Sequence, residues 1–140
     1  MIKHGFKAFN AKQIFNWVYK HNNHDPKTWS NISKNLIQFC EENLSFSLPE
    51  IIWEGESKDG TRKFLFRFSD KNTVETVAIP AKDRLTLCVS SQVGCAIGCT
   101  FCHTGTMGLT RHLEAGEVVG QYLAVQKFLL EKGSEQKITN

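Results

Sequence analysis

The strongest constraint on the fold of this chain is a run of three cysteines that directly follows a predicted strand. Cys95, Cys99 and Cys102 are spaced Cys-x₃-Cys-x₂-Cys, and residues 85–90 before them have the composition of a strand. A helix with a broad apolar face, as expected of a helix covering a parallel sheet, is predicted over about residues 114–132. Strand, cysteine loop and helix together predict the first β/α unit of a barrel whose active site lies at the C-terminal ends of its strands.

The cysteine spacing also predicts a metal centre. Iron in an iron–sulfur cubane is tetrahedral and normally takes one thiolate per corner. Three thiolates within the eight-residue segment 95–102 therefore leave one iron open to an outside molecule. S-adenosylmethionine is the expected guest, because a reduced cluster can donate an electron to its sulfonium and release a carbon radical.

Zinc is the main alternative to an iron–sulfur cluster. His103 follows Cys102, and Cys₃His is a legitimate structural zinc set, although zinc ligands are usually split into two separated pairs. A disulfide framework is less favoured, because five cysteines is an odd number and the chain does not open on a secretory signal. Clustered thiols in such a chain indicate a reducing cytoplasm.

Charge is unevenly distributed along the chain. The formal net charge is only +3, but residues 1–24 contain four lysines, three histidines and no acidic residue. This basic end suits contact with phosphate, and lysines that only keep a small helical unit soluble would give the same pattern. No span of about 18 consecutive apolar residues occurs, so no transmembrane helix is predicted.

The N-terminal part is predicted to be helical. Residues 11–20 show helical apolar spacing, and a second helix is predicted to begin at Asp25-Pro26. The apolar stripe of this second helix consists of Ile32, Leu36, Phe39 and Cys40. We assign Cys40 to the core, because a free cysteine behaves as a small apolar residue. These patterns predict a compact helical subdomain over residues 1–47.

The apolar period changes to that of strands after Pro49. Strands are predicted at residues 51–53, 63–68, 73–79 and 85–90, the third ending at Pro80. Phe64, Phe66 and Phe68 share one face of the second strand, and we assign them and Trp53 to the core. Residues 48–80 are thus expected to be a β-rich connecting segment, with the barrel beginning in residues 81–140.

Two stretches resemble a known enzyme family. The segment from Arg84 to Cys95, RLTLCVSSQVGC, with the residues that follow it, closely resembles the radical SAM dual-specificity RNA methyltransferases. The residues that continue this resemblance are Cys99, Phe101, Cys102, Thr104, Gly105, Gly108, Arg111 and Glu117. The segment from Phe9 to Tyr19 is similar to the family's N-terminal helical RNA-binding domain, and the resemblance covers essentially all 140 residues.

The resemblance implies roles for particular residues. Cys95, Cys99 and Cys102 correspond to the three ligands of a [4Fe–4S] cluster that binds S-adenosylmethionine. Cys88 matches the cysteine that removes a proton from adenine C2 and helps to release the RNA, and Glu75 matches a proton acceptor. The residues alone leave Cys88 open between an inert strand thiol and a catalytic one, and they make Glu75 a solvated strand position.

The resemblance also implies the reaction. The family methylates C2 of an adenine in 23S rRNA and tRNA in the cytoplasm, using a 5′-deoxyadenosyl radical, a second cysteine that carries the methyl group, and an electron donor such as flavodoxin. A disulfide is also associated with the family. The methyl-carrying cysteine and a Gly-Glu-Pro segment are absent from these 140 residues. We therefore expect the chain to be an N-terminal portion that is inactive alone.

Two other functions remain open at this point. The relatives that methylate C8 of the same adenine and confer antibiotic resistance share the cysteine loop, although Ser91-Gln92-Val93-Gly94 and Val74-Glu75-Thr76-Val77 favour the C2 enzymes. A noncatalytic RNA-binding module with zinc in the loop is the alternative from another class. Glu114 and His103 depart from the family pattern at a helix cap and beside the loop, without touching the three ligands.

The predicted fold class is accordingly α+β leading into α/β. It comprises an N-terminal helical subdomain, a small β-sheet, and then the first β/α unit of a partial, truncated radical SAM barrel. Its expected partners are 23S rRNA and tRNA, with no membrane.

Overall fold

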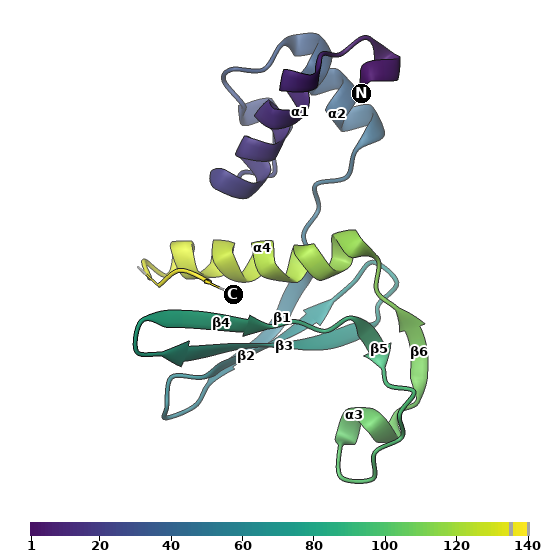
Figure 1. The fold of residues 1–140 in the computed structure, drawn as a ribbon, viewed down its shortest axis with the longest axis vertical. Helices are drawn as coiled ribbons and strands as arrows, with labels where there is room; N and C mark the ends of the chain where they lie inside the picture. The colour runs from purple at the N-terminus through teal and green to yellow at the C-terminus, as the bar shows by residue number, and fades with distance from the viewer. Residues whose placement is uncertain (135, 140) are drawn as a thin grey trace. The chain divides into compact units, whose positions relative to one another are not determined.

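A computed structural model describes residues 1–134 and 136–139, with only the backbone of Ile2 (Figure 1). The chain divides into two compact units, Met1–Ser47 and Leu48–Asn140. Residue 80, where a further boundary was expected, lies inside the sheet of the second unit, so residues 48–80 and the residues that follow them share one unit.

The first unit consists of short helices. They are η1 (Ile2–His4), α1 (Ala8–Phe15) continued by the π-helical η2 (Asn16–Lys20), the 3₁₀ turn η3 (Pro26–Thr28), and α2 (Lys34–Asn43). Leu36 and Cys40 of α2 are completely buried, which confirms the assignment of Cys40 to the core. Of the other two residues in the predicted stripe, Phe39 is half-buried, and Ile32 is buried but precedes the helix.

The start of the second helix was predicted wrongly. Asp25 caps only the turn η3, by accepting from the backbone N–H of Lys27 at 3.1 Å. The helix α2 begins eight residues later, where the Ser33 hydroxyl caps the N–H of Leu36 at 3.4 Å. Between the two caps the chain is extended at Trp29, whose side chain is 2% exposed. Burial of this indole overrides the helical signal of Asp25-Pro26.

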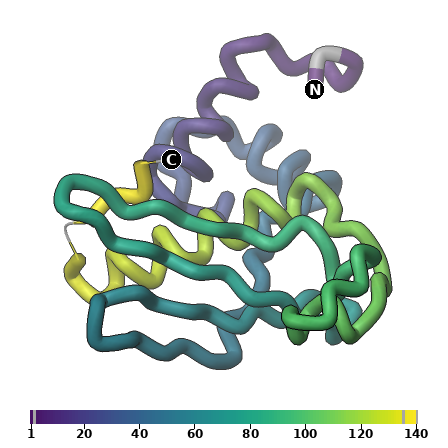
Figure 2. Tube along the Cα trace, turned by 60° about the horizontal axis from the view of Figure 1, so that its bottom comes forward, coloured from purple at the N-terminus to yellow at the C-terminus, as the bar shows by residue number. Residues whose placement is uncertain are grey.

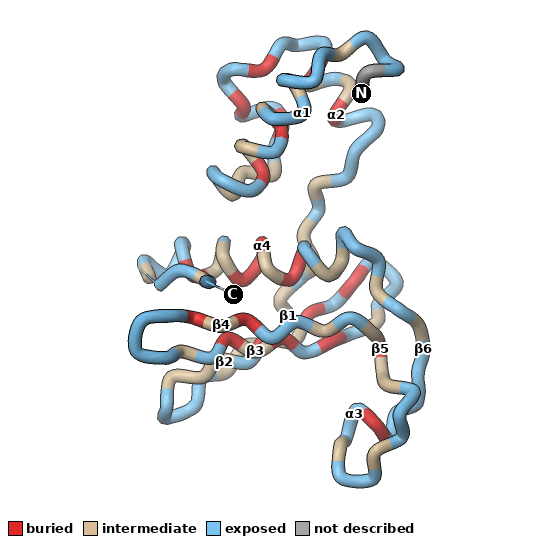
Figure 3. Tube along the Cα trace, in the orientation of Figure 1, coloured by how far each residue is buried: buried red, intermediate tan, exposed pale blue. Residues whose placement is uncertain are grey.

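The second unit is a four-stranded antiparallel sheet covered on one face by a helix (Figure 2). Its strands lie in the order β1 (Glu50–Glu56), β2 (Arg62–Arg67), β3 (Thr73–Ala81) and β4 (Arg84–Cys88). Buried positions alternate along β2, β3 and β4, and the buried side faces α4 (Ala115–Glu131) (Figure 3). The core includes Phe64, Phe66, Phe68, Val74, Ala78, Leu85, Leu87, Ala124, Val125 and Leu129.

The sheet differs from the parallel sheet that the helix pattern predicted. β4 pairs antiparallel with β3, and its only parallel partner among the described residues is a single bridge from Leu85 to Ile138. The N–H of Thr139 donates to the carbonyl of Leu85 at 3.0 Å, so the chain returns from α4 alongside β4. The predicted order of strand, cysteine loop and helix is present, from β4 to α4, but β4 belongs to an antiparallel sheet.

Two strand ends also differ from prediction. β3 runs through Pro80 to Ala81, because the pairing of β3 with β2 ends at Ala78 and Pro80 needs to pair with β4 alone. β4 ends at Cys88 rather than Ser90. The backbone of Ser90 is bonded instead to the side chain of Gln121, which removes it from the ladder.

Trp53 was assigned to the core, and this assignment was wrong. A register irregularity after Ile51 moves Trp53 onto the face of Leu65, opposite the buried Phe66 that pairs with Ile51. The indole is 53% exposed and folds back over Gly55. The three phenylalanines of the second strand are buried as predicted.

Among residues 1–134 and 136–139, no helix is both long enough and apolar enough to cross a membrane.

Candidate active site

Glu75 and Cys88 lie on the same face of the sheet, opposite the helix-covered core. The register pairs Lys63 of β2 with Val77 of β3, and Val77 with Cys88 of β4, so these three residues form one row. Glu75 lies two residues from Val77 on β3. Directly paired residues and residues two apart on a strand point to the same side of a sheet. This side, which α4 does not cover, is called the open face.

A cavity of about 510 Å³ lies over the open face at the end of β4. It brings together both catalytic candidates and the beginning of the cysteine loop. Its lining residues are Lys63, Leu65, Thr73, Val74, Glu75, Val77, Cys88, Val89, Ser90, Gln92, Gly94, His103, Thr104 and Met107. The resemblance had indicated Glu75 and Cys88 separately, and the strand register explains how residues thirteen positions apart share one cavity.

Glu75 is an accessible carboxylate with one cationic neighbour. Its Oε1 lies 3.3 Å from Nζ of Lys63, and the two side chains are 55% and 47% exposed. An exposed pair of this kind contributes little stability, so the carboxylate remains available to a molecule in the cavity. Lys63 carried no sequence signal, because a lysine in an alternating strand is an ordinary surface residue.

Cys88 is the last residue of β4, and its side chain is exposed. A buried, inert strand cysteine was the alternative for this position, and burial on the core side is excluded by the register. Cys40 is the contrasting case in the chain: it is fully buried, and that burial raises the pKa of its thiol. Position alone thus makes Cys88 the more available nucleophile or base.

A buried glutamine fixes the chain just after Cys88. The side chain of Gln121, on α4, is 0% exposed. Its Oε1 accepts from the backbone N–H of Ser90 at 3.0 Å, and its Nε2 donates to the carbonyl of Ser90 at 2.9 Å. The Ser90 hydroxyl donates to the carbonyl of Glu75 at 2.7 Å. Ser90 is therefore held from both sides, between Cys88 and the cysteine loop.

The cysteine loop is closed by a short hairpin that sequence patterns did not predict. β5 (Gln92–Gly94) pairs antiparallel with β6 (Leu109–His112), and the loop lies between them. The N–H of Cys95 donates to the carbonyl of Gly108 at 3.0 Å. Gly94 has φ of +75°, and a Cβ there would lie 1.9 Å from the same carbonyl oxygen. Only glycine fits at this closing point of the loop.

A one-turn helix, α3 (His103–Thr106), follows the third cysteine and packs against the backbone of the second, Cys99. Gly105 is buried against the backbone of Cys99, and a Cβ at Gly105 would lie 2.9 Å from the nitrogen and 2.8 Å from the oxygen of Cys99. The N–H of Cys102 donates to the carbonyl of Cys99 at 3.3 Å. The path of the loop between its second and third cysteines is thus set by main-chain contacts.

The three loop thiols suit an iron–sulfur cluster in chemistry and accessibility. Cys95, Cys99 and Cys102 are half-buried and free, and the N–H of Ile97 lies 3.5 Å from Sγ of Cys95, as a donor to a cluster thiolate would. In the described part of the chain no three His, Cys, Asp or Glu side chains converge on a single-ion site. A cubane does not require that convergence, because each thiolate binds its own iron.

All five cysteines are free, so the structure contains no disulfide among them. His103, the fourth ligand of the zinc alternative, is exposed at the start of α3 and lines the cavity of the open face.

An arginine joins the cysteine hairpin to the rest of the unit. Arg111 of β6 forms two hydrogen bonds with Glu117 of α4, at 2.7 and 2.8 Å, and its Nε donates to Asp70 at 2.7 Å. Hydrogen bonds from Arg111 and then Asn72 lower the pKa of Asp70 to about 2. A hydrogen bond from Arg111 also lowers the pKa of Glu117. This network links the β2–β3 turn, β6 and α4.

Glu114 is the N-cap of α4, and its backbone N–H donates to Glu117 at 2.9 Å. The carboxylate of Glu117 therefore binds the N-cap backbone, while no side-chain cap hydrogen bond from Glu114 takes the place of the expected hydroxyl.

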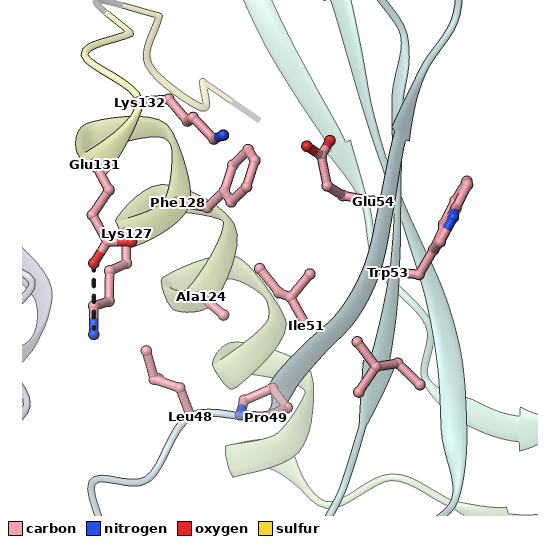
Figure 4. A pocket seen from close by; sticks show the side chains of 11 residues that line it. Leu48, Pro49, Ile51, Trp53, Glu54, Ala124, Lys127, Phe128, Glu131 and Lys132 are labelled. Atoms are coloured by element: carbon pink, nitrogen blue, oxygen red, sulfur yellow. Dashed lines mark ion pairs between the residues drawn. The ribbon is translucent and has the colours of Figure 1, made fainter.

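A second cavity, of about 570 Å³, lies between α4 and β1 (Figure 4). Ile51 of β1 faces Ala124 and Phe128 of α4 across it, and Trp53 points to the other side of the strand. Lys127 and Glu131 pair at 3.9 Å on its rim. The cavity includes none of the cysteines and lies on the core side of the sheet, away from the open face.

Comparisons with known proteins agree with the resemblance. Residues 1–44 match the family described as the ribosomal RNA large subunit methyltransferase N-terminal domain. The chain is 46% identical over 136 residues to the dual-specificity RNA methyltransferase RlmN of Bdellovibrio bacteriovorus, covering 97% of this chain and 33% of that protein. The RlmN of Geotalea uraniireducens is 47% identical over 123 residues, covering 88% of this chain and 36% of that protein.

The chain matches the N-terminal portion of the RlmN family. A crystal structure of a radical SAM methyltransferase from Sphaerobacter thermophilus agrees with this, with a TM-score of 0.85 and 40% identity. The similarity to that structure covers 99% of this chain and 40% of the other. The chain thus spans about a third of the length of its curated RlmN relatives, and the predicted family resemblance is confirmed.

Proposed function

We propose that this chain is the N-terminal part of a radical SAM methyltransferase that methylates C2 of an adenine in 23S rRNA and tRNA. The observation that supports this most is the cavity of the open face, where Glu75 and Cys88 meet the beginning of a loop with three free thiols. The relatives that align with these residues are named dual-specificity RNA methyltransferases.

Cys95, Cys99 and Cys102 would hold a [4Fe–4S] cluster, with S-adenosylmethionine at the iron that lacks a protein ligand. When bound, these groups supply the carbon radical that methylation of an electrophilic amidine carbon requires. C2 of adenine offers no electron pair for ordinary methyl transfer, so a radical route is needed.

The chain's own residues then handle the proton and the position of the base. Cys88, exposed at the end of β4, acts as the thiolate that removes the proton from C2 and helps to release the RNA. Glu75 accepts a proton in the same cavity, and Nζ of Lys63, 3.3 Å from its Oε1, orients the carboxylate. The helical unit 1–47 binds the RNA, in keeping with its acid-free stretch over residues 1–24.

Metal content tests this proposal directly. Anaerobic reconstitution of the 140-residue chain should give about four irons and four sulfides per chain, and a brown protein with an absorption band at about 400 nm. Alanine at Cys95, Cys99 or Cys102 should abolish it, and Cys40→Ala is the matched control that should keep it. Stoichiometric, colourless zinc would overturn the proposal in favour of a zinc-containing RNA-binding module.

Two further results follow from the same proposal. The isolated chain should not methylate rRNA fragments, since it spans about a third of its relatives' length. In a full-length protein that carries this segment, the modified nucleoside should be C2-methyladenosine, and a C8 product would assign the chain to the resistance relatives instead.

A further inference from the structure

The outer side of the first helix carries aromatic rings and lysines that the core of its unit does not use. Phe9, Phe15 and Tyr19 are 57%, 58% and 38% exposed. Lys12 and Lys20, between and after them, are exposed as well. These five side chains, on α1 and η2, are called the α1 face.

The packing of the unit explains why this side is left open. Ile14 and Val18 are buried at 8% exposure each, and Trp17 donates from Nε1 to Oδ1 of Asn31 at 2.7 Å. The ring of Trp17 also lies parallel to that of Trp29, with centroids 6.2 Å apart. Because side chains on one side of a helix recur every three to four residues, the inner side is complete and the α1 face points away from it.

Phe15 and Tyr19 form a flat aromatic pair. Their ring centroids are 4.4 Å apart, with an interplanar angle of 29°. The chain widens to π-helical geometry from Asn16, where the N–H of His21 donates to the carbonyl of Asn16 at 3.0 Å. Such local widenings of a helix are frequent at functional sites. Exposed, stacked rings suit a third planar group added to the stack.

The charge around these rings selects the class of ligand. Lys12 and Lys20 flank the pair, and among the residues that the structure describes neither forms an ion pair with a carboxylate. No acidic residue occurs between Met1 and His24. A ligand that is both planar and anionic fits this combination. In RNA, only unpaired nucleotides offer a free base face, because a duplex encloses its bases.

We propose that the α1 face binds an unpaired nucleotide of the substrate RNA. Its base stacks on the pair formed by Phe15 and Tyr19, and Lys12 and Lys20 neutralise the phosphates on either side of it. This inference rests on the proposed function only in taking RNA as the ligand. It adds that the helical unit selects single-stranded segments, rather than attracting RNA of any shape by charge.

Binding of the 140-residue chain to two probes tests the inference. The probes are a fluorescein-labelled unstructured oligouridylate and a blunt RNA duplex of equal length. The single strand should bind more tightly, and the double variant Phe15→Leu with Tyr19→Leu should weaken its binding at least about fivefold. Tyr19→Phe, which keeps a ring, should bind like the parent chain. Leucine preserves the apolar surface, so this comparison separates stacking from hydrophobic contact.

Salt dependence separates the lysines from the rings. Lys12→Gln with Lys20→Gln should reduce the slope of log K against log salt concentration by about 1.4 for a single strand, whereas the leucine variant should leave it unchanged. Lys34→Gln, an exposed lysine on α2, is the matched control and should change the slope less.

Three outcomes would overturn the inference: equal binding of duplex and single strand, unchanged binding by the leucine variant, or a change in that variant's sedimentation that shows the α1 face to be a contact between copies. Circular dichroism of each variant checks that the helical unit is folded. The iron content of the chain does not depend on these residues, so failure here leaves the test of the proposed function independent.

Discussion

Gln121 and Thr76 meet in the core of the second unit, where neither side chain is exposed. The Thr76 hydroxyl donates to Oε1 of Gln121 at 2.7 Å, and the same oxygen accepts from the N–H of Ser90 at 3.0 Å. One side chain of α4 therefore fastens β3 and the exit of β4 together. The position of Ser90, just after Cys88 on the open face, is thus fixed from the helix-covered side of the sheet.

Gln121→Leu should destabilise the second unit strongly. The substitution keeps the volume but leaves the Thr76 hydroxyl and the N–H and carbonyl of Ser90 without partners, at a cost of about 2 to 5 kcal/mol in the free energy of unfolding. Urea denaturation followed by circular dichroism measures this cost. Thr76→Val is the matched control, because it removes only one donor and should cost about 1 kcal/mol. Equal losses of unfolding free energy for the two variants would contradict a stabilising role for the hydrogen bonds between Gln121 and Ser90.

Stability should fall in acid through the network of Arg111. The pKa values of Asp70, at about 2, and of Glu117 are both lowered, chiefly by hydrogen bonds from Arg111. A carboxyl group whose pKa is lower in the folded state stabilises that state above its unfolded pKa, and the contribution is lost as the pH falls through the folded value. The free energy of unfolding should therefore decrease from about pH 5 down to about pH 2.

Arg111→Gln provides the comparison for that pH dependence. Without the guanidinium the two carboxyl groups return toward their ordinary pKa values, so the variant should be less stable at neutral pH and should change less with acid. Urea midpoints measured across the same pH range give both slopes. Parallel curves for the parent chain and the variant would show that other carboxylates set the acid response.

The elements that could be predicted from sequence are those fixed by a local period. Alternation in β2 placed Phe64 and Phe66 in the core, and helical spacing placed α4 within one residue of its observed bounds at either end. The cavity of the open face was not predictable in this way. It depends on the register of three strands, which sets Lys63 and Glu75 beside Cys88 through pairings between segments far apart in the chain.

The missed features share a physical cause, which is tertiary contact that overrides a local pattern. Gln121 interrupts an apolar helix face. This polar residue at a core position was the one sequence signal for its buried hydrogen bonds to Thr76 and Ser90. Val119 and Leu130 of α4 are 37% and 58% exposed, because the sheet covers a narrower stripe of the helix than the broad apolar face that was predicted. The register shift that exposes Trp53 likewise depends on β2 and has no signal in β1 itself.

Gly105→Ala should impair cluster assembly more than folding. A methyl group there would lie within 2.9 Å of the Cys99 backbone, so the loop must move to accept it. Iron bound after anaerobic reconstitution should drop, while the circular dichroism of the sheet and α4 stays close to that of the parent chain. Full iron content in this variant would show that the path of the loop is adjustable.

Gly116→Ala is the matched control for that experiment. Gly116 lies in the first turn of α4, and a Cβ there meets nothing within 4 Å. Since alanine favours a helix over glycine by up to about 1 kcal/mol, this variant should keep its iron and unfold at an equal or slightly higher urea concentration.

Cys88 and Cys40 should differ sharply in their reaction with iodoacetamide. Cys88 is exposed at the end of β4, whereas Cys40 is 0% exposed and burial raises the pKa of its thiol. The thiolate is the reacting form, so Cys88 should be alkylated in the native chain and Cys40 only when its helical unit opens. Peptide mass spectrometry locates the label over time, and the two rates should converge in urea. Similar rates in native buffer would contradict the placement of Cys88 on the open face, and Cys88→Ala identifies any signal that comes from the loop thiols.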